Sequence, residues 1–186
     1  MNSRWILTAV AVVAVGTIGV SLIVGESGKA KGTQPVASGT KEGPACKPEN
    51  KANLEFTVKD MNGSNVRLTD YQGKVILLNY WATWCGPCKV ELPALIELYD
   101  DYKDKGFVVL GVSADDDPET LRAFAAEWKM NYPVLVGRDH EDLLDAFGPL
   151  FGYPTSYFIG RDGSVCGKHF GPGSKEDFEK TIKALL

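Results

Sequence analysis

A Cys-Gly-Pro-Cys motif at residues 85–88 constrains the fold of this chain more than any other stretch. An uninterrupted apolar run over residues 75–81 precedes the motif, and a helical pattern of apolar residues follows it. Two cysteines separated by two residues, between a strand and a helix, are typical of a redox-active dithiol. We therefore expect the reactive centre of the protein in the turn that joins these two elements.

The two cysteines of the motif are expected to have different roles. Cys85 would lie at the helix N-terminus, where unpaired backbone N–H groups and the helix dipole stabilise an anion. Cys88 would be turned inward by the first helical turn. Cys85 is therefore the predicted nucleophile, which attacks as a thiolate, and Cys88 is the predicted resolving thiol.

Three prolines add to this pattern. Pro87 would stand at the start of the helix, where a fixed φ and a missing N–H cost nothing. Pro93 falls inside the apolar helical pattern and predicts a kink there. Pro154 precedes a strand-like run over residues 155–159, so it either enters a strand in the ordinary way or forms a cis-proline loop that faces the dithiol.

These motifs together resemble those of thioredoxin-fold proteins. The resemblance rests on the sequence NYWATWCGPCK at residues 79–89, on Pro93, and on Tyr-Pro-Thr at residues 153–155. It is greatest to the membrane-anchored TlpA-like and ResA-like thiol:disulfide oxidoreductases, and it covers about residues 50–186. The resemblance implies a thioredoxin-like α/β fold, in which a central mixed β-sheet is flanked by helices, with an N-terminal β-hairpin and a helical insertion. It also implies a set of substrate-binding residues around the dithiol, namely Trp84, Gly86, Pro87, Tyr153 and Pro154.

Two further positions distinguish this chain from cytosolic thioredoxin. Asn79 occupies the position of a buried aspartate in thioredoxin, six residues before the first cysteine, and an amide cannot accept a proton. Glu91 matches an acid that ResA-like proteins carry near the dithiol. Helical spacing places Glu91 one turn beyond Cys88, so we expect it to exchange a proton with that thiol. The alternative is a solvent-exposed carboxylate that the helix dipole favours.

Residues 5–24 form an uncharged, apolar run of 20 residues that is long enough to span a bilayer. The residues just after it make a poor signal-peptide cleavage site, so we predict an uncleaved signal-anchor within residues 1–24, and the alternative is a cleaved signal segment. Residues 25–51 lack apolar periodicity and are rich in Gly, Ser, Lys, Thr and Pro, which predicts a flexible tether. Residues 52–186 would then form the thioredoxin-like domain.

The side of the membrane on which this domain lies does not follow from the charges that flank the apolar run. Lysines follow the run, so the positive-inside count alone does not place that side outside the cell. The resemblance to exported relatives implies an extracytoplasmic, periplasmic domain that one N-terminal segment attaches to a bacterial cell membrane.

Two cysteines lie outside the motif, Cys46 in the predicted tether and Cys166 in a strand-like run. In an oxidising compartment a structural disulfide between them would pin the tether onto the sheet, and this is our prediction. The alternative is two inert or intermolecular thiols.

The rest of the chain predicts alternating strands and helices. Asn-Gly at residues 62–63 is a hairpin signal, and Asp-Pro at residues 117–118 starts a helix that, with the next strand, resembles the insertion of TlpA-like proteins. The expected elements are a hairpin over residues 56–68, strands over 75–81, 107–113, 132–136, 155–159 and 164–170, and helices starting at the dithiol and covering 117–129, about 141–147 and from 174 onwards.

Other kinds of site have weaker support. The cysteines and histidines lack the paired spacing of a zinc site, and position 89 is Lys where haem attachment requires His. The acidic run at residues 115–117 lacks the spaced oxygens of a calcium loop, so we expect a solvated turn and a helix cap there. We therefore predict neither a metal nor a cofactor. After residue 46 the chain has 16 Lys and Arg against 22 Asp and Glu, a net charge of −6, which argues against a nucleic-acid partner.

Two classes of function remain. The first is a protein disulfide reductase that acts on exported client proteins, which the resemblance implies are apocytochromes c awaiting haem or respiratory oxidase proteins, with a membrane protein as electron donor. A thiol peroxidase is less well supported, because Thr83 does not stand in the expected T-x-x-C spacing from Cys85. The second class is a non-catalytic thioredoxin-fold module that binds clients or assists assembly. The presence of both motif cysteines argues against that class, since binding alone needs neither.

Overall fold

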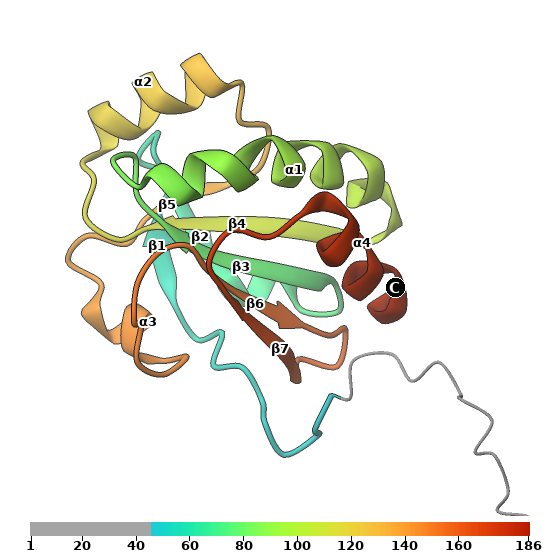
Figure 1. Cartoon of the computed structure of the whole chain (residues 1–186). Coiled ribbons are helices and arrows are strands. Elements are labelled where there is room, and N and C mark those ends of the chain that lie inside the picture. Colours follow the sequence, from blue (N-terminus) through green and yellow to red (C-terminus); the bar gives the residue numbers. More distant parts are fainter. Residues whose placement is uncertain (1–45) are drawn as a thin grey trace, which may run out of the picture. The chain divides into compact units, whose positions relative to one another are not determined.

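The computed structural model describes residues 46–186. Its centre is a five-stranded mixed sheet in the order β5-β4-β3-β6-β7, and a separate two-stranded hairpin precedes it in the chain (Figure 1). The strands are β1 Thr57–Lys59, β2 Asn65–Arg67, β3 Val75–Trp81, β4 Phe107–Ser113, β5 Val134–Val136, β6 Thr155–Ile159 and β7 Val165–Phe170. The helices are α1 Gly86–Tyr102, α2 Pro118–Trp128, α3 Glu141–Asp145 and α4 Lys175–Leu185, with short 3-10 turns at η1 Leu68–Tyr71 and η2 Lys103–Lys105. The predicted thioredoxin-like fold is therefore confirmed, including the hairpin at the start of the domain.

The two central strands are apolar because both of their faces are covered. Every residue of β3 and β4 is buried, and the strands run parallel in register from the pair Val75–Phe107 to the pair Trp81–Ser113. Strands buried on both faces read as continuous apolar runs, and for this reason the sequence predicts their bounds well. β6 then pairs antiparallel with β3, and β7 pairs antiparallel with β6, which makes the sheet mixed.

Side chains that alternate along β3 enter two separate cores. Leu77 faces the core formed with α1, α2 and α4, whereas Ile76 and Leu78 face the core formed with α3, the hairpin and residues 52–54. Figure 1 shows α1 and α4 lying across one face of the sheet. This alternation is the period-2 pattern of a strand, and it fixes which face of the sheet carries the helix that begins at the dithiol.

α1 runs as one helix from Gly86 to Tyr102 with Pro93 inside it, and the kink at Pro93 stays a prediction. Two other predicted elements differ in detail from the structure. The strand predicted over residues 132–136 begins only at Val134, since Pro133 has no N–H to donate to the sheet. The helix predicted up to about residue 147 ends at Asp145.

The N-terminal part of the described chain is attached to the edge of the sheet. A disulfide joins Cys46 to Cys166 in β7, as predicted. The N–H of Val165 donates to the carbonyl oxygen of Asn50 at 2.8 Å, and the N–H of Ala52 donates to that of Gly163 at 2.9 Å. Residues 46–51, which the sequence assigned to the tether, therefore lie against the sheet.

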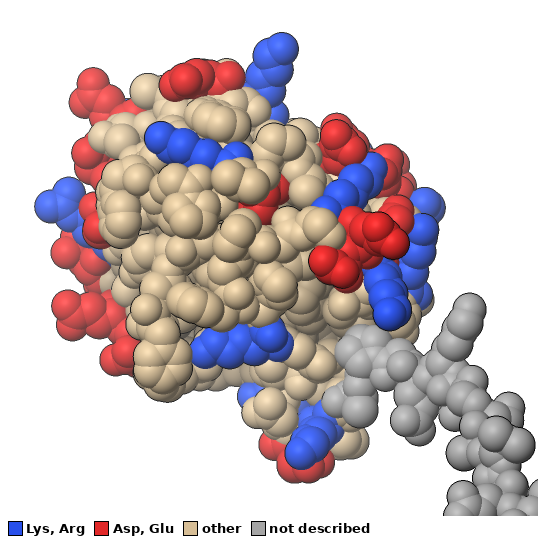
Figure 2. Space-filling view, in the orientation of Figure 1, with Lys and Arg blue, Asp and Glu red and all other residues tan. Residues whose placement is uncertain are grey.

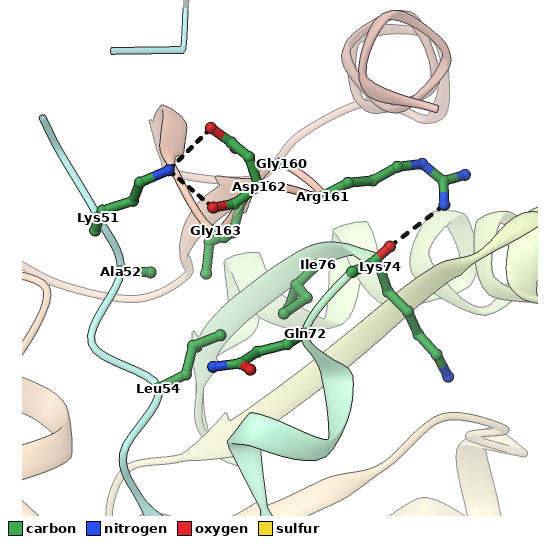
Figure 3. A pocket seen from close by; sticks show the side chains of 12 residues that line it. Lys51, Ala52, Leu54, Gln72, Lys74, Ile76, Gly160, Arg161, Asp162 and Gly163 are labelled. Atoms are coloured by element: carbon green, nitrogen blue, oxygen red, sulfur yellow. Dashed lines mark hydrogen bonds and ion pairs between the residues drawn. The ribbon is translucent and has the colours of Figure 1, made fainter. Parts of the chain in front are cut away.

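A pocket of about 420 Å³ lies at this same end of the sheet, where β3 begins and β6 ends (Figure 3). The Nζ of Lys51 is 3.0 Å from Oδ2 of Asp162 and also donates to the backbone oxygen of Asp162 at 2.8 Å. Arg161 donates through Nη1 to the carbonyl oxygen of Gly73 at 3.3 Å. Lys51 therefore holds residues 46–52 against the turn between β6 and β7. Arg161 links that same turn to Gly73, before the start of β3.

Within residues 46–186 no helix combines the length and the apolar character needed to cross a bilayer. The predicted anchor at residues 5–24 and the predicted tether up to residue 45 lie outside the described residues.

Candidate functional site

The dithiol lies where α1 begins, directly after the carboxyl end of β3. Cys85 is the N-cap residue of α1, with an extended backbone, and its Sγ accepts a hydrogen bond of 3.2 Å from the N–H of Cys88. Pro87 occupies the first turn, where its missing N–H leaves no bond unmade. The sulfur of Cys85 thus contacts a helix N–H, as expected for a thiol that must be stabilised as an anion.

The two cysteines form a disulfide, so the structure represents the oxidised protein. Their Cα atoms lie 5.3 Å apart. Cys85 and Cys88 are equally buried, each with an exposed fraction of 5 %. The two cysteines therefore differ in hydrogen bonding and not in exposure. The Sγ atom of Cys85 accepts a hydrogen bond from the backbone N–H of Cys88.

The loop before β6 lies beside the dithiol turn. Thr155 pairs with Tyr80 near the end of β3, and the preceding Tyr153–Pro154 bond is cis. The ring of Tyr153 meets the indole of Trp84 edge to face, with centroids 6.1 Å apart. Of the two interpretations of Pro154, the structure therefore has the cis-proline loop beside the residue that precedes the nucleophile.

The surface around the dithiol is apolar. Trp84, which directly precedes Cys85, has an exposed fraction of 64 %, and Phe151, three residues before the cis-proline, is also exposed. Figure 2 shows that the side of the molecule carrying α1 and the loop before β6 has few charged residues across its centre, with most of them at the edges. An exposed apolar surface of this kind is typical of a place where another protein docks.

Glu91 lies one turn beyond Cys88 on the inner side of α1 and is almost completely buried. Its Oε1 accepts 2.8 Å from Nδ2 of Asn79, and its Oε2 accepts 3.0 Å from the N–H of Gly173. Burial raises the pKa of the Glu91 carboxyl to about 7, although the bonds from Gly173 and Asn79 oppose that rise. The solvent-exposed alternative for Glu91 is therefore wrong.

Two residues near Glu91 have roles that the sequence did not reveal. Asn79 also donates to Oγ of Ser156 at 3.0 Å, so its amide links β3, α1 and β6. Tyr132 is buried, and its pKa is raised by that burial and further by the charge of Glu91. Tyr132 therefore keeps its proton at neutral pH.

The acidic run before α2 matches the predicted solvated turn and helix cap except at Asp116, which is buried. Asp117 caps α2 as expected, since its carboxylate accepts from the N–H groups of Glu119 and Thr120. Asp115 accepts a bond of 3.1 Å from Nε1 of Trp84. Asp116 is buried, and its carboxylate accepts hydrogen bonds from Thr83 and Ser113. Sequence reasoning missed this because three adjacent aspartates are typical of an exposed turn.

Residues 46–186 contain no group of three or more His, Cys, Asp or Glu side chains that is arranged to hold a metal ion.

Comparison with known proteins places these features in a family. Residues 49–167 match the model of the AhpC/TSA family. The chain belongs to the AhpC/TSA family. One similar protein is the thiol-disulfide oxidoreductase ResA of Bacillus thuringiensis subsp. konkukian. It is 34 % identical to this chain over 130 residues, which is 70 % of this chain and 74 % of ResA.

Two other proteins are similar to this chain. The thioredoxin-like protein YneN of Bacillus subtilis is 30 % identical over 184 residues, which is 98 % of each chain. A thiol:disulfide interchange protein of the thioredoxin family from Chlorobium tepidum has a crystal structure that superposes with a TM-score of 0.68 at 28 % identity, covering 73 % of this chain and 95 % of that one. This AhpC/TSA protein is a thiol-disulfide oxidoreductase with a thioredoxin-like fold.

Proposed function

We propose that this protein reduces disulfides in exported client proteins by exchange at Cys85 and Cys88. The observation that carries the proposal is the position of Cys85, whose sulfur accepts a helix N–H at the start of α1 and is bonded to Cys88, one turn before a buried carboxyl group. This arrangement supplies a stabilised thiolate, a second thiol within bonding distance and a group that exchanges protons near neutral pH.

The reaction begins with the reduced dithiol. The thiolate of Cys85 attacks one sulfur of the client disulfide, a mixed disulfide forms, and the other client sulfur leaves as a thiolate. Cys88 then loses its proton and attacks the sulfur of Cys85, which releases the second client thiol. Two electrons have passed to the client, and the Cys85–Cys88 disulfide seen in the structure is the oxidised product.

Glu91 is the proposed acceptor of the proton that Cys88 loses. Its carboxyl lies one helical turn from Cys88, and its pKa of about 7 lets it take up a proton at neutral pH. Asn79 and Gly173 hold both carboxylate oxygens and so fix its orientation.

Clients would dock across the dithiol turn and the cis-proline loop. Trp84 is exposed there and contacts Tyr153, while Gly86 and Pro87 are exposed in the first turn of α1. A client segment in an extended conformation would bind the backbone beside Tyr153 and Pro154, as an added strand does at a sheet edge.

The reducing direction, the location and the electron source belong to the proposal as well. Gly-Pro between the cysteines matches thioredoxin, with a potential of about −270 mV, rather than oxidants with potentials of about −120 mV. Residues 5–24 would anchor the domain on the outer side of a bacterial membrane, and a membrane protein would return electrons to Cys85 and Cys88. Clients would include apocytochromes c and proteins of respiratory oxidases.

Two measurements test this function. The purified protein should accelerate the reduction of insulin disulfides by dithiothreitol, and a Cys88→Ala variant expressed in cells should retain clients as mixed disulfides on Cys85. Absence of insulin reduction, with clients bound equally by a variant that lacks both cysteines, would instead support the non-catalytic binding module.

A further inference from the structure

Asp116 lies beside the dithiol turn although it belongs to a different connection of the chain. β3 and β4 run parallel, and Trp81 pairs with Ser113 at their carboxyl ends. The N–H of Ala114 donates to the carbonyl oxygen of Trp81 at 3.1 Å. The turn before α1 and the turn before α2 therefore leave the sheet next to each other.

The carboxylate of Asp116 accepts three short hydrogen bonds in this place. Its Oδ2 accepts from the N–H of Thr83 at 2.8 Å and from Oγ of Ser113 at 2.6 Å, and its Oδ1 accepts from Oγ1 of Thr83 at 2.6 Å. The residue is 8 % exposed. A buried carboxylate that accepts three hydrogen bonds, two from Thr83 in the turn after β3 and one from Ser113 at the end of β4, is part of a specific arrangement, because hydrogen bonds to a charged acceptor are strong and directional.

We propose that Asp116 is a positioning residue for client recognition, which holds Thr83 and thereby presents Trp84 in the conformation that the client meets. The inference rests on the proposed function. Both the backbone and the side chain of Thr83 are held, and the next residue, Trp84, stays exposed between Asp115 and Tyr153. A docking residue held in place before binding loses less freedom on binding, which strengthens the complex.

The nucleophile does not depend on Asp116 in the same way. The sulfur of Cys85 accepts its hydrogen bond from Cys88, inside α1, and no bond of Asp116 reaches that helix. Loss of Asp116 should therefore raise the KM for a protein client while the reactivity of Cys85 toward a small alkylating reagent stays the same.

Three variants and one control separate positioning from general stability. Asp116→Ala removes all three bonds. Asp116→Asn keeps the shape, since its amide oxygen accepts from the Thr83 N–H and the Ser113 hydroxyl while its amide nitrogen donates to a reoriented Thr83 hydroxyl. Thr83→Val removes only the hydroxyl bond. Asp60→Ala is the control, because Asp60 accepts two backbone N–H bonds, from Asn62 and Ser64, in the hairpin turn beside β5, which is two strands from β3.

The full-length variants are compared by steady-state reduction of insulin, by iodoacetamide labelling of reduced Cys85 and by thermal unfolding. We expect Asp116→Ala to raise the KM by about 10- to 100-fold, the range that follows from a small displacement of a positioned group, with kcat and labelling changed by less than about twofold. Asp116→Asn should restore most of the loss, and Thr83→Val should raise the KM by a smaller factor. Asp60→Ala should lower Tm without changing KM.

An unchanged KM in both Asp116→Ala and Thr83→Val would overturn the inference, as would an equal rise of KM in Asp60→Ala at an equal loss of Tm. Should Asp116→Ala fail to fold, Thr83→Val alone decides. A wild-type protein that does not reduce insulin would overturn the proposed function and the inference together, whereas an active wild type with unaffected variants would remove the inference alone.

Discussion

Asn79 donates a hydrogen bond of 2.8 Å from Nδ2 to Oε1 of Glu91, and both side chains are buried. Cytosolic thioredoxin has a buried aspartate where this chain has Asn79. The amide carries no charge and no exchangeable acid proton, so the acid–base capacity near Cys88 lies on α1 rather than on β3. Asn79 then serves to orient the carboxyl of Glu91.

The first prediction concerns the rate at which Cys88 resolves a mixed disulfide. Because the pKa of Glu91 is raised to about 7, its carboxylate form appears as the pH rises through 7, and the resolving step should accelerate over that range. Glu91→Gln should slow this step at pH 8 by about 100-fold, which is the lower end of the usual contribution of a general base. Rapid chemical quenching, with the mixed disulfide quantified by mass spectrometry, measures the step.

The matched control for Glu91→Gln is Glu97→Gln, since Glu97 lies on the same helix but is exposed and paired with Lys175. This control should keep the wild-type pH profile. A wild-type profile in Glu91→Gln would assign the proton to water or to another group.

The second prediction concerns the stability of the oxidised protein. The pKa of Glu91 is raised in the folded state from an ordinary value of 4.5 to about 7, so between these values the folded protein holds a proton that the unfolded chain releases. This term of the free energy of unfolding is therefore fully present below pH 4.5 and is lost as pH rises to about 7, by at most about 3 kcal/mol. Urea unfolding of the wild type at pH 5 and at pH 8 measures the loss, and the difference should be smaller in Glu91→Gln. An identical pH dependence in the two proteins would show that Glu91 titrates as an ordinary carboxyl.

The third prediction assigns the two thiols. Cys85 should have a pKa below the unperturbed value of about 8.5, because its sulfur contacts a helix N–H. Iodoacetamide at pH 7 should label Cys85 before Cys88 in the reduced protein. Cys85→Ser should abolish disulfide reduction, whereas Cys88→Ser should accumulate mixed disulfides. Faster labelling of Cys88 would reverse the assignment.

The fourth prediction concerns the disulfide between Cys46 and Cys166. It closes a loop with a sequence separation of 120 residues, for which chain entropy sets an upper value of about 4 to 5 kcal/mol. The double variant Cys46→Ser, Cys166→Ser should melt at least about 5 °C lower while it still reduces insulin, because the bond lies away from the dithiol. Calorimetry and the insulin assay check the two parts. If the folded double variant no longer reduces insulin, the Cys46–Cys166 disulfide is required for the reaction and is not only structural.

Sequence reasoning was most successful where one local property determines the outcome. The bounds of β3 and β4 follow from apolar runs that are buried on both faces, and the start of α1 follows from the dithiol and Pro87. The start of α2 is equally local, because the Asp117 side chain bonds to the first N–H groups of its own helix.

The rest of the site depends on contacts between distant parts of the chain. The burial of Glu91 requires Gly173, which lies 82 residues later, to close over it. The place of Asp116 depends on a strand pairing that brings it to Thr83, 33 residues earlier. Neighbouring residues in the sequence do not indicate these long-range contacts. An acidic run is therefore predicted to be a solvated turn unless the strand order is known.

The attachment of residues 46–52 to β7 has a mechanical consequence. Tyr80 pairs with Thr155 near the dithiol, whereas Ile76 pairs with Ile159 at the other end of the same strands, next to the turn between β6 and β7 to which residues 50–52 are bonded. A pull transmitted along the chain into Cys46 therefore enters the domain through a covalent bond to Cys166 in the edge strand. Tension in the preceding chain therefore enters the sheet at the end opposite the turn that carries Cys85.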